Sequence, residues 1–253
     1  MYVELYKLLR KKTTYLLILP LALPLFWGFA LVLNIDTGIV EDGITYELIS
    51  RGVGFLEFTY EMISLANIFY TFVIIIISAL LMAKEIETNE INLYVVRVGA
   101  RAKILWARFI ALFTVQIIFY FLFILLTGII YLLLADVETH GIAEIWDTDI
   151  NRYLVAILAT FVSNAILLTL TLLVGVQLKT FACFATVFIL YVISLYFEQF
   201  ATWLQLLFPE HFATYVIQNG LTEISSLLYF LLFLLYGGIF LVAGMILFKR
   251  KEL

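Results

Sequence analysis

Charged side chains gather in one polar stretch of this chain, between residues 83 and 108, and long apolar runs flank it on both sides. The charged residues of interest are Glu85, Glu90, Arg97, Arg101, Lys103 and Arg108. Ile86, Glu90 and Arg97 recur at helical spacing, which predicts a short helix with mixed faces. Gly99 provides a break after that helix. A charged loop of this kind is a place where a soluble partner could push.

Catalytic and metal-binding motifs are absent from the sequence. The two histidines, His140 and His211, are far apart, and Cys183 is the only cysteine, so no metal-ligand spacing is present. The sequence contains no G-x-x-x-x-G-K-[ST] or G-x-G-x-x-G phosphate loop, no H-E-x-x-H and no Gly-x-Ser-x-Gly elbow. We therefore expect that this chain is not an enzyme and holds no cofactor or metal of its own.

The composition indicates a membrane protein. Of the 253 residues, 64% are hydrophobic and 13% are charged, whereas about a quarter of the residues of a soluble domain are charged. Continuous apolar runs long enough to cross about 30 Å of hydrocarbon predict six transmembrane helices. They lie near residues 14–33, 60–82, 105–134, 151–176, 181–203 and 225–248. The predicted fold class is an all-α polytopic membrane protein, with residues 1–253 forming a single domain.

The basic residues orient this predicted topology. With six spans, all but two of the 15 Lys and Arg residues fall on one side of the membrane, the exceptions being Arg51 and Arg152. Because cytoplasmic loops carry an excess of Lys and Arg, both termini and the 83–108 stretch are predicted to face the cytoplasm. The expected location is therefore the cytoplasmic (plasma) membrane.

Two segments outside the clean spans have a mixed character. Residues 1–13 predict an amphipathic helix at the cytoplasmic interface, with its basic residues near anionic head groups. Its apolar face carries Leu5, Leu8 and Leu9, and its polar face carries Glu4, Lys7 and Lys11. The alternative is a plain basic flank that only sets topology. Residues 198–224 are too polar for a span and too apolar for a free loop, which predicts short interfacial or re-entrant helices.

The predicted spans hold almost no ionisable side chains. A charge at a helix centre costs about 2.5–3.5 kcal/mol on insertion scales, and ion-coupled transporters keep such groups for their function. Glu198, near the outer end of the fifth predicted span, comes closest. Gln116, Asn164 and Gln177 are neutral and are expected to form hydrogen bonds between helices. Ion coupling through this chain alone is therefore not expected, and the energy for any uphill transport would come from elsewhere.

The 83–108 stretch resembles the same region of the permease subunits of type-two ABC exporters. In that family an acid follows the second span, and then come a short helix, a break, an Arg and a basic residue entering the third span. Glu85, Arg101 and Arg108 fall at those positions. The resemblance extends over the whole chain in its architecture of an interfacial N-terminal helix and six spans. It departs at Asn89, where Gly is common, at Val98–Gly99 in place of a usual Pro, and at Arg108, where Lys is frequent.

The resemblance implies the membrane-spanning subunit of an ATP-driven exporter, with an amphipathic or hydrophobic cargo such as a peptide or antibiotic. ATP and Mg would bind a separate soluble subunit docked beneath the 83–108 stretch, which would act as a lever. A second permease copy or paralogue would face this one, and no nucleic acid would be involved. The residues implied in coupling to the ATP-binding subunit are Glu85, Glu90, Arg97, Arg101, Lys103 and Arg108.

Two other functions are compatible with the same residues. A secondary transporter or channel would act alone on an ion gradient, with Glu198 as the residue to neutralise. A membrane scaffold or sensor would share the basic stretch without moving a solute. For the stretch itself, the alternative to a lever is a solvated segment that only sets topology.

Overall fold

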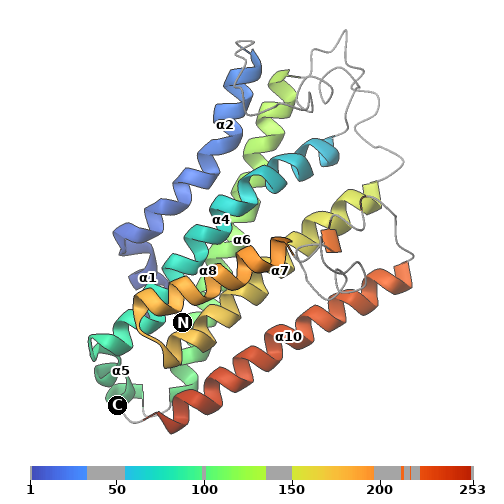
Figure 1. The fold of residues 1–253 in the computed structure, drawn as a ribbon. Coiled ribbons are helices and arrows are strands. Elements are labelled where there is room, and N and C mark those ends of the chain that lie inside the picture. The colour runs from blue at the N-terminus through green and yellow to red at the C-terminus, as the bar shows by residue number, and fades with distance from the viewer. Residues whose placement is uncertain are drawn as a thin grey trace.

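The computed structural model is a bundle of α-helices (Figure 1). It describes residues 2–32, 55–98, 101–134, 150–196, 212–213, 217 and 223–251. The elements are α1 (Tyr2–Arg10), the 3₁₀ helix η1 (Lys12–Leu17), α2 (Ile18–Val32), α4 (Phe55–Glu87), α5 (Glu90–Val98), α6 (Arg101–Leu134), α7 (Ile150–Gln177), α8 (Thr180–Tyr196) and α10 (Glu223–Arg250). The all-α prediction is confirmed for these residues. The segment 198–224 falls almost wholly outside them.

Four helices of the described part are long and apolar enough to cross a membrane, so the prediction of six spans is wrong for these residues. The four are Phe55–Glu87, Arg101–Leu133, Asn151–Gln177 and Tyr229–Arg250, in α4, α6, α7 and α10. The segments expected near 14–33 and 181–203 instead form the shorter apolar helices Lys12–Phe26 and Thr180–Tyr196. Length and composition therefore support a multi-pass membrane protein with four candidate spans.

The two shorter apolar helices are not long enough, as continuous α-helices, to cross a membrane. An α-helix rises about 1.5 Å per residue, so the 17 residues of α8 cover about 25 Å, less than the hydrocarbon thickness of about 30 Å. The first apolar segment is divided between η1 and the 15-residue α2, which contains Pro24. Proline lacks the amide hydrogen of an interior helical bond, which weakens a continuous helix there. By contrast, α4 and α6 have 33 and 34 residues, more than a bilayer core requires.

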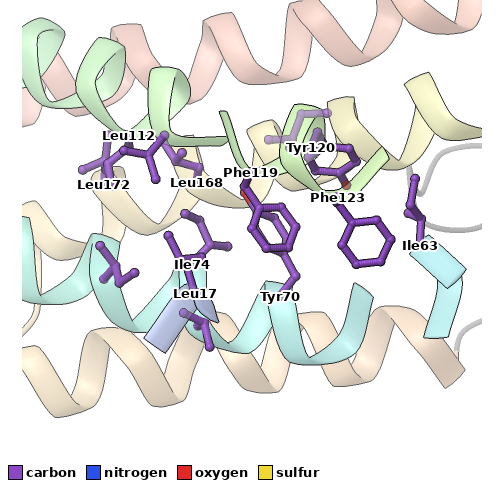
Figure 2. Packing of buried hydrophobic residues seen from close by; sticks show 14 of the residues in the cluster. Leu17, Ile63, Tyr70, Ile74, Leu112, Phe119, Tyr120, Phe123, Leu168 and Leu172 are labelled. Carbon is purple, nitrogen blue, oxygen red and sulfur yellow. The ribbon is translucent and has the colours of Figure 1, made fainter. Parts of the chain in front are cut away.

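The long helices run side by side, and α7 packs most extensively on α4 and α10 (Figure 1). Both termini lie at the end of the bundle that carries α1 and α5, which we call the basic end. The core lies between α4, α6 and α7, where Tyr70, Ile74, Phe119 and Leu172 are almost fully buried (Figure 2). In the most apolar stretch of α4, 61% of the residues are buried, against 11% in α10, so most of the surface of α10 is left uncovered by the described part of the chain.

One glycine allows the closest approach between α4 and α7. A Cβ atom on Gly175 would lie 3.2 Å from the Met82 Cβ and 3.4 Å from the Ala83 backbone nitrogen. Both neighbouring atoms belong to or adjoin the α4 backbone, so they cannot move aside without shifting the helix. The absence of a side chain at Gly175 therefore sets the distance between the two helices near the basic end.

Candidate functional site

Glu85 is the centre of the candidate site, which lies in the last turn of α4. Its side chain is 2% exposed, and it pairs with Arg108 of α6, whose side chain is fully buried. The Arg108 Nη2 donates to the Glu85 Oε2, and its Nη1 lies 3.1 Å from the Met82 sulfur. A buried charge is tolerated only when it is paired. Glu85 and Arg108 can therefore be buried only because each neutralises the charge of the other.

The second carboxylate oxygen of Glu85 is occupied by the N-terminal helix. The Nζ of Lys7 lies 2.6 Å from Glu85 Oε1, and the Nζ of Lys11 lies 2.9 Å from the same atom. Lys7 lies in α1, and Lys11 directly follows the last residue of α1, where its amide donates to the Leu8 carbonyl at 3.1 Å. Both lysines therefore reach one acceptor. We call Lys7, Lys11, Glu85 and Arg108 the Glu85 cluster. It joins the N-terminal segment to α4 and α6.

Tyr94 extends the cluster to α5. The Lys7 Nζ donates to the Tyr94 hydroxyl at 2.9 Å and lies 4.5 Å from the centroid of its ring. Burial lowers the pKa of Lys7, but its hydrogen bonds to Glu85 and Tyr94 outweigh burial and raise the pKa above the ordinary 10.5. Lys7 is therefore charged at neutral pH, and it connects α1, α4 and α5.

The turn between α4 and α5 is short and has a defined conformation. The Asn89 φ angle is 58°, in the left-handed region, and its amide donates to the Ile86 carbonyl at 3.1 Å. Asparagine adopts this region more readily than most other residues with a side chain, which explains why it is tolerated at this turn. The Thr88 amide also donates to the Lys84 carbonyl at 2.8 Å, closing the end of α4.

A separate contact ties the end of α4 to the start of α8. The Glu87 Oε2 accepts hydrogen bonds from the Thr180 amide at 3.2 Å and from its hydroxyl at 2.8 Å. A carboxylate near the first turn of a helix satisfies an amide that lacks an intrahelical partner and favours the helix dipole. Because this contact is exposed to solvent, it contributes little to the free energy of folding. Its main effect is to position the start of α8 beside the end of α4.

The end of α10 is held in the same way by α6 and α7. Arg101 donates to the carbonyls of Phe248 at 3.3 Å and Lys249 at 3.4 Å, and also to that of Lys251. Lys251 in turn donates to the Val176 carbonyl near the end of α7. Cations at a helix C-terminus satisfy its last carbonyls and its dipole. At the basic end, side chains of one helix thus bind the ends of others.

The six residues predicted to couple to a partner occupy three different settings. Glu85 and Arg108 are brought together inside the bundle, and Arg101 binds the end of α10. Glu90 and Lys103 are exposed and take no part in the Glu85 cluster. Arg97 belongs to α5, and its side chain lies outside the described part of the structure. Of the predicted set, Glu85 and Arg108 therefore form an ion pair in the interior, whereas Glu90 and Lys103 lie on the outer surface.

Sequence reasoning missed the contribution of the N-terminal helix. Its polar face was expected to meet lipid head groups, yet Lys7 and Lys11 turn inward to Glu85. Leu8 is fully buried, whereas Leu9 is 49% exposed, so the expected apolar face is divided as well. The spacing of Lys7 and Lys11 was the available signal, but it does not reveal which surface the two lysines contact.

The other sequence candidates give no sign of a catalytic or metal site. No group of three or more His, Cys, Asp or Glu that could hold a metal occurs among the residues searched, which are the described ones. His140, His211 and Glu198 lie outside that part of the chain. Cys183 is buried, with its sulfur 3.6 Å from the Thr171 carbonyl.

The expected hydrogen bonds between helices are confirmed at two of three positions. The Gln116 Nε2 donates to the Phe161 carbonyl at 2.7 Å, which joins α6 to α7. Asn164 of α7 is fully buried and bonds to both α4 and α6. Gln177, the last residue of α7, is exposed.

Comparison with known proteins identifies one family. Its model, described as "Protein of unknown function (DUF2705)", matches residues 17–253. No curated protein and no solved structure matches the chain. The family match covers all four candidate spans and the Glu85 and Arg108 positions, while Lys7 and Lys11 precede it. The chain is therefore a member of the DUF2705 family.

Proposed function

We propose that this chain is the membrane subunit of an ATP-driven exporter of the ABC type, with its basic end in the cytoplasm. The observation that carries the proposal is the Glu85 cluster, which fastens the short helix α5 and the N-terminal helix to two candidate spans. A lever between a soluble engine and a membrane path needs a stiff attachment at this position. The cluster supplies one through paired buried charges.

The outer surface of α5 suits contact with a soluble partner. Val96 is 84% exposed, and Glu90 on the same helix is exposed as well. An exposed apolar side chain would lose its contact with water on docking, so Val96 is the residue of α5 that we assign to the contact with the partner. Displacement of α5 would pass through Tyr94 and Lys7 to Glu85, and from there to α4 and α6. The ATP-binding subunit would thus push on α5 without touching Glu85.

The composition of the candidate spans supports an uncharged or amphipathic cargo. Residues 62–83, 109–134, 153–177 and 224–248 contain no Asp, Glu, Lys or Arg. A path for ions or for strongly charged solutes would need such groups within the membrane. ATP and Mg would remain on the soluble subunit, and a second permease, either a copy or a paralogue, would complete the path. Peptides and antibiotics belong to this class of cargo.

The first test is purification of the tagged chain from its native host in mild detergent, after crosslinking in intact membranes. The expected result is a stoichiometric soluble protein with a phosphate-binding loop and ATPase activity in the complex. Val96→Asp should abolish its recovery, because a carboxylate would lie at the apolar contact. The matched control is Leu133→Asn, since Leu133 is 77% exposed near the opposite end of α6.

Other outcomes would favour other functions. A chain that crosslinks to no nucleotide-binding protein, yet moves a solute in liposomes with an ion gradient, would be a secondary transporter. A chain without ATPase partner and without transport would be a scaffold or sensor. Either result would reject the exporter proposal.

A further inference from the structure

The ends of α4, α6, α8 and α10 are joined to one another at the basic end. The Glu85 cluster ties the end of α4 to the N-terminal segment and to α6. Glu87 binds Thr180 at the start of α8, and Arg101 at the start of α6 binds the Phe248 carbonyl near the end of α10. The lysines that adjoin these ends and are exposed are Lys12, Lys103, Lys179 and Lys249. They therefore surround one end of the bundle from different segments of the chain.

On three of these segments, an exposed apolar or aromatic side chain lies three residues farther into the bundle. The lysine pairs, as we call them, are Lys12 with Tyr15, Lys103 with Trp106, and Lys249 with Ile246. Tyr15 is 61% exposed, and Trp106 and Ile246 are each 46% exposed. Residues three apart share one face of an α-helix and are eclipsed in a 3₁₀ helix. Each lysine pair therefore places a positive charge about one turn beyond an apolar surface.

The exposed charge at the basic end is mostly positive. Arg10, Lys84 and Arg250 are exposed there in addition to the four lysines above. Among the described residues of this end, the exposed acids are Glu87 and Glu90, on either side of the turn between α4 and α5. The surface therefore attracts anions.

The apolar members of the lysine pairs indicate which anion fits this surface. Trp106 and Ile246 lie on candidate spans, where lipid is the expected neighbour of an exposed side chain. Tyrosine and tryptophan are enriched at the depth where the hydrocarbon meets the head groups, and lysine extends from there to the phosphates. A dissolved anion would neutralise the lysines but leave the apolar side chains uncovered. An anionic phospholipid covers both.

We propose that the lysine pairs bind anionic phospholipids, with each lysine at a phosphate group and its apolar neighbour against an acyl chain. The contact of the N-terminal segment with head groups is then made by Lys12, whereas Lys7 and Lys11 remain bound to Glu85. The binding depends on no ATP-binding partner, so it goes beyond the exporter proposal and can fail or hold independently of it.

The test compares Lys103→Gln with Lys84→Gln in the full chain. Both variants remove one exposed positive charge from the basic end, but the residue three positions before Lys84 is Leu81, which is 1% exposed. Lys84 is therefore a charge-matched control that has no apolar neighbour in the corresponding place.

Trp106 supplies a local readout. In nanodiscs of phosphatidylglycerol and phosphatidylcholine, one lipid at a time carries brominated acyl chains, which quench the fluorescence of a tryptophan that they touch. Subtracting the signal of Trp106→Phe isolates Trp106, and the two quenching curves give the preference for phosphatidylglycerol beside it. A lysine near an anionic surface contributes enough for Lys103→Gln to lower this preference about fivefold, and Lys84→Gln should leave it unchanged.

Three results would overturn the proposal. Trp106 that neither brominated lipid quenches does not contact lipid. A wild-type protein without preference for phosphatidylglycerol does not bind its charge. Equal losses in Lys103→Gln and Lys84→Gln would show that the preference comes from net charge alone, with no contribution from the pairing of Lys103 with Trp106.

Two further arms separate lipid from other anions. Sodium phosphate should reduce the preference no more than sodium chloride of the same ionic strength, and a specific effect of phosphate would assign the lysines to a dissolved anion instead. If Trp106 shows no lipid preference and Lys103→Gln instead prevents crosslinking to a soluble protein, the surface is a protein interface. Either result rejects the phospholipid site.

Discussion

Glu85 and Arg108, 23 residues apart in the sequence, form an ion pair in which both side chains are almost completely removed from solvent. In a type-two ABC permease these positions would be assigned to coupling, and a direct contact with the soluble subunit would be expected of them. In this fold they contact each other. The pair joins α4 to α6 at the basic end. In the proposed exporter, these two residues would hold α4 and α6 in place, and α5 would meet the partner.

Replacement of Glu85 by Gln should destabilise the bundle strongly. The substitution leaves Arg108 buried without a countercharge and Lys7 and Lys11 without their shared acceptor. Removing one partner of a buried pair costs about 3–5 kcal/mol, which denaturant titration in detergent would measure. Glu87→Gln is the control from the same helix end, and its exposed contact should cost less than about 1 kcal/mol.

The double variant Glu85→Gln with Arg108→Met tests whether the loss comes from the unpaired charge. Removing both charges should cost less than the sum of the two single changes, because neither partner is then left unsatisfied. Equal stability of Glu85→Gln and Glu87→Gln would show that the cluster is not a structural brace.

Gly175→Ala should destabilise the chain, whereas Gly238→Ala should not. The new methyl group on Gly175 would lie 3.2 Å from the Met82 Cβ, while nothing lies within 4 Å of a Cβ at Gly238. Overpacking of this kind typically costs about 1–3 kcal/mol. Thermal unfolding of the two variants in the same detergent is the measurement. A Gly175→Ala protein as stable as Gly238→Ala would mean that α4 and α7 separate easily.

Asn89→Val should loosen α5, and Asn89→Gly should not. A β-branched residue at φ 58° carries a strain of about 1–2 kcal/mol, whereas glycine adopts this conformation freely. Hydrogen exchange of the α5 amides should therefore accelerate in the valine variant alone. Unchanged exchange in both variants would show that the turn does not hold α5 in place.

The Lys7 contacts should be insensitive to pH up to strongly alkaline conditions. Because the folded-state pKa of Lys7 lies above 10.5, its contribution to stability is fully present below pH 10.5 and is lost as pH rises through the raised pKa. Lys7→Arg keeps its charge there, since the guanidinium does not titrate in this range. The melting temperatures of the two proteins should therefore diverge only above about pH 10.5. A divergence near neutral pH would contradict the prediction.

Several features of this protein follow from its sequence alone. Hydropathy identifies α4, α6, α7 and α10 as candidate spans, because transfer to lipid is a sum over neighbouring residues. The helix α5 follows from local periodicity. The break predicted at Gly99 lies outside the described residues. The hydrogen bonds of Gln116 and Asn164 follow because buried polar groups must find partners.

Only the tertiary structure decided which residues are the hydrogen-bond and ion-pair partners of these polar side chains. Glu85 meets Lys11 across 74 positions of sequence, and Asn164 meets Asn67 across 97. The same packing leaves the Tyr70 hydroxyl without a hydrogen-bond partner among the described residues. A sequence pattern defines the faces of one helix, but the surface that each face meets depends on how all the helices dock together. For that reason Lys7 and Lys11 could be placed on a common face from the sequence, and only the fold directed that face to Glu85.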